Sequence, residues 1–280
     1  MKRFFVTSVF AVFINLCFAL EPQDSLLIAN AKWHTDVNTP KGIIFKQAQI
    51  EGLYGSVQSI SLVEIPRSRK FQFGIAGNKG MRRTSQQASV HDALAAINGT
   101  YYNMRVGNSA CFYKIDKEVI DSTVMGEFLG RVNGAIRERG GELRIIAWDK
   151  DIEQAYRRKR GTVLASGPLL VMNGDMVGWS EFDQNFINAR HPRSALYVKR
   201  DGTTVFLTVD GRSRGNADGM SIPELAQVVK CLGAVDAINL DGGGSTTLWL
   251  QGLGVLNYPC DNRSFDHEGE RSVSNIIYVK

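Results

Sequence analysis

A strand–helix–strand pattern in the last third of the chain constrains the fold more than any other feature. Residues 203–210 read T-T-V-F-L-T-V-D, a β-branched and apolar run typical of a strand. Ser221 and Glu224 form a capping box that begins a helix, and Gly233 is suited to end it. A second apolar strand follows at residues 234–240. This order predicts a right-handed βαβ crossover in an α+β fold with a mixed β-sheet.

The crossover also predicts where a binding site lies. Two parallel strands that flank a crossover helix end at the same edge of a sheet, so Asp210 and Asp241 are expected to emerge side by side. Ligands of open α/β sheets bind at that carboxyl edge. We therefore expect the functional site near these two aspartates.

The second strand runs directly into the loop D-G-G-G-S, at residues 241–245. Successive glycines allow backbone N–H groups to converge on a phosphate, and the Ser245 hydroxyl is a further donor. The alternative is a tight turn into the next strand, although a plain hairpin seldom needs an acid and three glycines. Because no lysine follows the last glycine, the loop is not a Walker motif.

Two other segments carry candidate site residues. The loop D-G-R-S-R-G at residues 210–215 offers Arg212 or Arg214 as an anion contact and Asp210 as a base or an arginine partner. Alternatively, it holds only a surface salt bridge. In R-H-P-R-S, Arg193 is a candidate anion contact, while His191 is either a general acid or a residue that orders the loop.

Two further patterns are ordinary when taken alone. Asn98 ends an apolar run and precedes Tyr101 and Tyr102, an amide and two aromatics suited to a sugar. Glu270 and Arg271 form a charged turn before the closing strand. Neither segment establishes a site without its neighbours.

The N-terminus predicts export. Lys2 and Arg3 precede an apolar stretch, residues 4–18, which is too short to span a bilayer comfortably and fits a signal peptide cleaved after Ala19. Lipid attachment at Cys17 is disfavoured by Leu16, which stands where a small residue is needed. We expect a periplasmic or extracellular protein with no membrane span after cleavage.

Charge and cysteines restrict the partners. The net charge of +5 is a mild excess, and the sequence contains no long run of basic residues, which argues against nucleic-acid binding. Cys111, Cys231 and Cys260 remain after signal cleavage, without zinc-type spacing. Either one disulfide, Cys231 to Cys260, or three buried free thiols is expected. No cofactor is required; a divalent cation is conceivable, but no ligand spacing demands it.

In this order the motifs resemble the phosphodiester glycosidase family. The similarity runs from Asn98 to the C-terminus through I-N-G-T-Y-Y, S-G-P-L-L-V, H-P-R-S-A-L, V-D-G-R, L-D-G-G-G-S, N-Y-P-C-D and E-R-S-V-S-N. It divides the chain into a signal peptide (residues 1–19), a variable β-rich region that shapes specificity (20–97) and the glycosidase domain (98–280). One departure is T-Y-Y at residues 100–102, where many relatives have an acid followed by two phenylalanines.

The resemblance implies an exported hydrolase that cleaves a sugar-1-phosphodiester at the anomeric carbon, releasing sugar and a phosphomonoester. Carried over motif by motif, the implied catalytic residues are Asp241, Asp210 and Glu270. The implied substrate and phosphate contacts are Asn98, Arg193, Arg212, Gly243, Gly244, Ser245 and Arg271.

Two other functions are compatible with the same residues. One is a phosphodiesterase or phosphatase that breaks the P–O bond. The other is a non-catalytic module that binds a glycan or the cell wall. In each case the expected partner is a sugar-1-phosphodiester or a cell-surface glycan.

Overall fold

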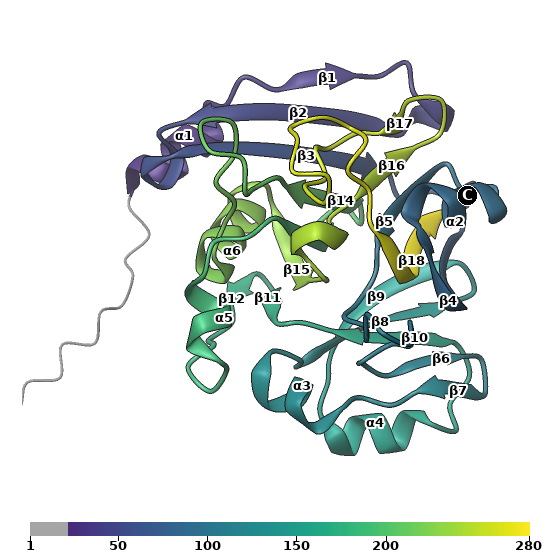
Figure 1. The fold of residues 1–280 in the computed structure, drawn as a ribbon. Coiled ribbons are helices and arrows are strands. Elements are labelled where there is room, and N and C mark those ends of the chain that lie inside the picture. Colours follow the sequence, from purple (N-terminus) through teal and green to yellow (C-terminus); the bar gives the residue numbers. More distant parts are fainter. Residues whose placement is uncertain (1–21) are drawn as a thin grey trace, which may run out of the picture.

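The computed structural model describes residues 22–280 and arranges them in three β-sheets with short helices at their edges and faces (Figure 1). The eight-stranded sheet has the order β1 (His34–Asp36), β2 (Ile44–Glu51), β3 (Val57–Ile65), β14 (Thr204–Val209), β13 (Arg193–Lys199), β15 (Ala234–Asn239), β11 (Leu169–Met172) and β12 (Asp175–Met176).

Each of the two smaller sheets has five strands. The first has the order β7 (Glu118–Asp121), β6 (Tyr113–Ile115), β10 (Thr162–Ser166), β8 (Gly134–Arg139) and β9 (Glu142–Ala147). The second has the order β17 (Gly254–Val255), β16 (Leu248–Leu250), β5 (Ala95–Asn98), β18 (Ser272–Val279) and β4 (Phe73–Arg83). The α-helices are α1 (Pro22–Ala29), α2 (Thr84–Val90), α3 (Met125–Gly130), α4 (Lys150–Tyr156), α5 (Gln184–Asn188) and α6 (Ile222–Cys231).

The strands and helix of the predicted crossover form, but the sheet is not mixed. Ser221 caps α6, and Glu224 completes the capping box. Both β14 and β15 pair antiparallel with β13, which lies between them. They therefore run in the same direction without touching as a parallel pair. The prediction of a mixed sheet is wrong because β13 and β14 form a tight hairpin that fills the place beside β15; every strand pairing within residues 22–280 is antiparallel.

The large sheet is buried on both faces. Because strand side chains alternate, Phe206 of β14 faces the core shared with the smaller sheets, which includes Ile97 and Ile136. Its neighbours Val205 and Leu207 face α6 and pack in a second core with Leu225. The apolar run of residues 204–209 thus reflects a strand covered on both sides.

The N-terminal region shares sheets with the rest of the chain. β3 pairs with β14, and β4 pairs with β18, so no separate sheet is formed before residue 98. That this region varies among relatives and shapes specificity stays a prediction. The predicted signal peptide lies outside the described residues, and none of the helices within residues 22–280 has the length and apolarity to cross a membrane.

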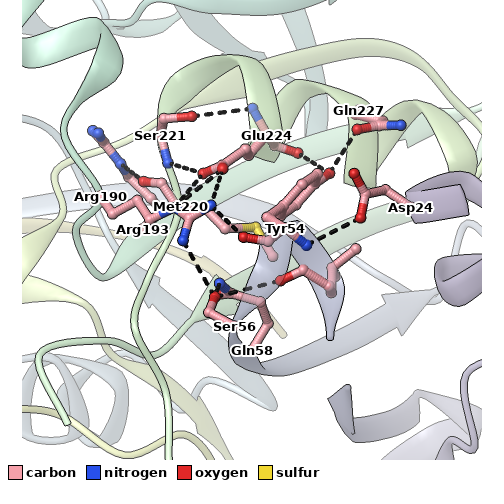
Figure 2. A network of polar contacts seen from close by, with 11 residues as sticks. Asp24, Tyr54, Ser56, Gln58, Arg190, Arg193, Met220, Ser221, Glu224 and Gln227 are labelled. Atoms are coloured by element: carbon pink, nitrogen blue, oxygen red, sulfur yellow. Dashed lines mark hydrogen bonds and ion pairs between the residues drawn. The ribbon is translucent and has the colours of Figure 1, made fainter. Parts of the chain in front are cut away.

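A polar network joins this N-terminal region to the start of α6 (Figure 2). The Arg190 guanidinium donates to the Glu224 carboxylate, with Nε 3.1 Å from each oxygen. It also donates to the Tyr54 carbonyl at 2.7 Å, and the Tyr54 hydroxyl donates to the Glu224 carbonyl at 2.9 Å. The network holds the beginning of α6 against the turn between β2 and β3.

All three described cysteines are free. Cys111 is buried, Cys231 is exposed and Cys260 is partly exposed. The expected alternative of a Cys231–Cys260 disulfide is therefore not formed, and only one of the three thiols is buried.

Candidate functional site

A cavity of about 120 Å³ lies where loops from several elements meet. Asp241 follows β15, and Ser245 ends the 3-10 turn η3 (Gly243–Ser245). Arg271 directly precedes β18, and Arg131 directly follows α3. The cavity is lined by Tyr101, Tyr102, Met104, Arg131, Asp241, Gly242, Ser245 and Arg271. It thus combines one carboxylate with two guanidinium groups, two phenols and a hydroxyl.

The backbone of Asp241 is held firmly against the end of β5. Its N–H donates to the Gly99 carbonyl at 3.0 Å, and its carbonyl accepts from Asn98 Nδ2 at 2.7 Å. The Gly242 N–H donates to Asp241 Oδ1 at 3.0 Å and so orients the carboxylate. Burial raises the pKa of Asp241, opposed by hydrogen bonding to Ser245 and by the positive charge of Arg131. The result is a positioned carboxylate of increased basicity.

Each guanidinium of the cavity is fixed by an acid behind it. Arg131 donates to both oxygens of Glu127, at 2.6 and 2.9 Å, and its guanidinium carbon lies 3.6 Å from the centre of the Tyr101 ring. Arg271 Nε donates to Asp261 Oδ1 at 3.0 Å. Paired and stacked guanidinium groups keep a fixed orientation, which suits them to holding an anion.

Sequence reasoning missed Arg131. It follows α3, a six-residue helix in a segment without a recognisable motif. Its only local signal is the i, i+4 spacing from Glu127, which is common on helix surfaces. Its place in the cavity depends on contacts with Tyr101 and Phe186, which are distant in sequence.

The glycines of the D-G-G-G-S loop allow close packing. A Cβ atom on Gly242 would lie 2.5 Å from the Pro192 carbonyl oxygen. Gly243, with φ +62°, lies under the Arg212 guanidinium, and a Cβ on Gly244 would collide with Arg271.

Most backbone N–H groups of this loop donate hydrogen bonds to other groups of the protein. Gly243 N–H donates to the Pro192 carbonyl at 2.8 Å, and Ser245 N–H donates to the Gly242 carbonyl at 3.2 Å. The predicted cradle of N–H groups around a phosphate is therefore not the arrangement seen. Instead, the missing side chains of Gly243 and Gly244 let two arginines approach the loop.

Asn98 braces this loop instead of facing a ligand. It is fully buried, and while its amide donates to the Asp241 carbonyl, its Oδ1 accepts from Ser194 Oγ at 2.7 Å and from Thr247 N–H at 3.0 Å. One side chain therefore holds both ends of the loop that carries Asp241 and Ser245. The predicted contact of Asn98 with a sugar has no free polar atom to support it.

Asp210 does not line the cavity. It is 1% exposed and accepts hydrogen bonds from Ser59 Oγ at 2.7 Å, Asn257 Nδ2 at 3.1 Å and Tyr258 N–H at 2.8 Å. Burial raises its pKa, which these three donors oppose. The structure gives Asp210 the role of a buried anchor for the segment after β17, in place of the predicted catalytic role beside Asp241.

Arg193 also points away from the cavity. It is 2% exposed and donates to the carbonyls of Met220, Phe186 and Ala189 at 2.8, 3.2 and 2.7 Å. Figure 2 shows it beside Met220 in the network at the start of α6. Burial, together with the charges of Arg131 and Arg212, lowers its pKa to about 10. It joins three backbone segments and is not placed to bind a phosphate.

The last two predicted residues lie near the cavity without lining it. Glu270 accepts hydrogen bonds from the N–H and hydroxyl of Ser85, at 2.7 and 2.6 Å. It thereby provides an acceptor for a backbone N–H in the first turn of α2. Arg212 is exposed and lies over Gly243, with a guanidinium nitrogen 3.5 Å from His191 Nδ1. Of the implied site residues, the cavity thus brings together Asp241, Ser245 and Arg271.

His191 orders its loop through its backbone, which exchanges hydrogen bonds with Met220 at 3.2 and 3.0 Å. Burial and the charges of Arg193 and Arg212 lower its pKa, which favours the neutral ring. Within residues 22–280, no three His, Cys, Asp or Glu side chains gather in a way that would hold a metal ion.

Comparison with known proteins matches the same part of the chain. Residues 91–280 match the family model described as phosphodiester glycosidase. Mouse N-acetylglucosamine-1-phosphodiester alpha-N-acetylglucosaminidase is 35% identical over 95 residues. This match covers 34% of this chain and 18% of the mouse protein, so it spans less than a fifth of that relative.

Two solved structures share the fold. The catalytic domain of the zebrafish N-acetylglucosamine-1-phosphodiester alpha-N-acetylglucosaminidase superposes with a TM-score of 0.66 at 17% identity, covering 91% of this chain and 92% of that one. A hypothetical protein from Synechocystis superposes with a TM-score of 0.65 at 19% identity, covering 89% of this chain and 63% of that one. Because the family model spans more than half of the sequence, this chain belongs to the phosphodiester glycosidase family.

Proposed function

We propose that the protein hydrolyses the glycosidic bond of a sugar-1-phosphodiester and releases the sugar and a phosphomonoester. The observation that carries this proposal is the Asp241 carboxylate in a cavity whose other charged groups are the guanidiniums of Arg131 and Arg271. A carboxylate serves the anomeric centre, and two guanidiniums serve a phosphate. The name of the mouse relative makes an N-acetylglucosamine-1-phosphodiester the first substrate to test.

The phosphate needs charge stabilisation more than protonation. In a sugar-1-phosphodiester the leaving group is already a stable anion, so the site must stabilise negative charge as the bond to the anomeric carbon breaks. Arg271 and Arg131 supply charge-assisted donors, and Ser245 supplies a hydroxyl. Glu127 and Asp261 keep the two guanidiniums in place before substrate arrives.

Asp241 acts at the sugar. As an ionised carboxylate it either attacks the anomeric carbon or removes a proton from the attacking water, and in both cases it stabilises an oxocarbenium-like centre. Its raised pKa makes it a stronger base than an ordinary aspartate. The Tyr101 and Tyr102 rings form a wall of the cavity, and Tyr102 is fixed by donating to the Ser272 carbonyl at 3.0 Å.

Hydrolysis in isotopically labelled water tests this assignment. Cleavage at the anomeric carbon places the labelled oxygen in the released sugar, which mass spectrometry detects. Label in the phosphate would instead identify P–O cleavage, the phosphodiesterase alternative. Stable binding of the diester without any product would identify a non-catalytic binding module.

We also propose that the protein is exported through the leader at residues 1–19. Mass spectrometry of the protein from its native cells should find a mature chain that begins near Leu20, in the periplasmic or extracellular fraction. An intact Met1, or a lipid on Cys17, would contradict this proposal.

A further inference from the structure

A second hollow, a groove of about 490 Å³, shares no lining residue with the catalytic cavity and has no part in the chemistry described above. It lies between α3, the start of α4 and residues 178–182. The walls are tied together where Asp183 N–H donates to the Gly130 carbonyl at 3.2 Å, at the end of α3. We call this site the α3 groove.

The floor of the α3 groove is carbon-rich. Val132 and Trp148 are buried at its base, and Phe128, Trp179 and Phe182 are half-buried along its walls. Met125 stands at its edge and is 53% exposed. Exposed apolar surface of this kind, concentrated in a concave site, is typical of ligand pockets.

The polar groups of the groove are placed at its rim or used within the fold. Both indole N–H groups are bonded internally, Trp148 to Glu153 at 3.2 Å and Trp179 to the Leu169 carbonyl at 2.8 Å. The charged side chains Asp149, Lys150 and Glu181 are exposed at the rim. Because no buried polar side chain of the groove is left without a hydrogen-bond partner, its floor suits an apolar ligand better than a sugar.

The linings of the groove and of the catalytic cavity include neighbouring residues of the chain. The Arg131 guanidinium lines the cavity, and the next residue, Val132, lines the groove, with their Cα atoms about 3.8 Å apart. The groove therefore lies on the Arg131 side of the cavity, the side at which the proposed function places the phosphate. Small-molecule sites usually measure about 300–1,000 Å³, a range reached by the cavity and the groove together but not by the cavity alone.

We propose that the α3 groove binds the apolar arm of a long-chain alcohol esterified to the substrate phosphate. The preferred substrate is then a sugar-1-phosphate linked to a lipid-type alcohol, with the sugar and phosphate in the catalytic cavity and the chain in the groove. This inference rests on the proposed function for the position of the phosphate. The apolar lining of the α3 groove indicates that the second ester group on the phosphate is apolar.

Binding of alkyl phosphates tests the groove without relying on turnover. Each fully buried methylene strengthens binding about fourfold, so burying three of the nine extra methylenes of decyl phosphate gives a gain of about sixtyfold over methyl phosphate. Calorimetry below the micelle concentration should show decyl phosphate binding at least about thirtyfold more tightly. A gain of less than about threefold in the wild-type protein would overturn the proposal.

Two variants locate the binding. Met125→Glu places a charge at the exposed edge of the groove, and Phe182→Ala removes part of its wall; each should reduce the chain-length gain to about threefold or less. The matched control is Leu253→Glu, at an equally exposed apolar position near β17, which should keep the full gain. A full gain in both groove variants would show that the chain binds elsewhere and would overturn the assignment.

Turnover separates this inference from the proposed function. The wild-type protein should cleave methyl and decyl diesters of N-acetylglucosamine-1-phosphate, with a lower KM for the decyl ester. Cleavage of both with equal KM would leave the proposed function standing and refute the groove. No cleavage of either, together with chain-length-dependent binding that the groove variants abolish, would refute the glycosidase activity and uphold the groove.

Discussion

The loops that follow β14 and β15 each carry an Asp-Gly pair, in very different surroundings. Asp210-Gly211 and Asp241-Gly242 each end a strand, and the two strands run in the same direction in one sheet. Yet Asp210 is sealed by three hydrogen-bond donors, whereas Asp241 lines the cavity and is held by the Gly242 N–H and by Ser245.

The difference arises from what packs over each loop. The segment that begins at Asn257 covers Asp210 and supplies two of its donors. The region around Asp241 is bounded instead by Tyr101, Arg131 and Arg271, whose side chains leave a cavity. An Asp-Gly pair at a strand end therefore becomes a sealed anchor or a cavity-lining carboxylate depending on its neighbours.

The largest expected effect is on Asp241. Asp241→Asn keeps the shape but removes the charge and basicity, so kcat on a sugar-1-phosphodiester should fall by about 10²–10⁴-fold. The thermal midpoint should change little, because the amide oxygen still accepts from Gly242. Asp175→Asn, an exposed substitution in β12, is the control and should keep normal turnover. Near-normal kcat in Asp241→Asn would remove this residue from the mechanism.

The matching change at Asp210 should act on stability. Asp210→Ala leaves the donors of Ser59, Asn257 and Tyr258 without their acceptor inside the fold. We expect a loss of about 3 kcal/mol or more in the free energy of unfolding, measured by urea denaturation. If unfolding were unchanged while kcat fell as in Asp241→Asn, the two aspartates would share a catalytic role after all.

Two arginines sharpen the comparison at the level of binding. Arg271→Ala removes a charge-assisted donor from the cavity and should raise KM for the phosphodiester by about tenfold or more. Arg193→Ala leaves KM unchanged in the folded protein but lowers the free energy of unfolding, because three buried carbonyls lose their donor. The reverse pattern in steady-state kinetics and urea denaturation would place the phosphate at Arg193.

The smallest expected effect is a shift in pH dependence. Asp241 acts when ionised, so activity is present above its pKa and is lost as the pH falls through it. Burial raises that pKa, which places the acid limb of kcat/KM above the range of an ordinary aspartate. Because the Arg131 charge lowers the same pKa, Arg131→Gln should move the limb to higher pH, whereas the exposed control Arg144→Gln should not. An unmoved limb in Arg131→Gln would show that another group controls it.

Local patterns in the sequence were sufficient for the local structures. The capping box at Ser221 begins α6, and the apolar runs on either side form β14 and β15 as expected. The dipeptide Asn173-Gly174, a pattern typical of a hairpin turn, joins β11 to β12 with both residues at positive φ. The glycine-rich loop after β15 carries a cavity-lining acid, as its motif led us to expect.

The order of the strands in the large sheet could not be predicted from the sequence in the same way. The crossover pattern indicated two strands in the same direction but not the strand between them. β13 takes that place because its hairpin with β14 is a shorter connection than the one through α6. A choice between competing strand partners depends on the whole sheet and not on the pattern of one segment.

The sequence by itself determined the family, the elements around Asp241 and the motifs that carry the acid, the serine and the arginine of the cavity. Only the tertiary structure decided which charged residues line that cavity. Asp210 meets Ser59 across 151 residues, and Arg131 enters the cavity by stacking on Tyr101, contacts that no local pattern encodes. Solvation and pairing set the chemistry of a carboxylate or a guanidinium, and both are properties of the packed neighbourhood, so the same residue types serve as anchors in one place and as a site in another.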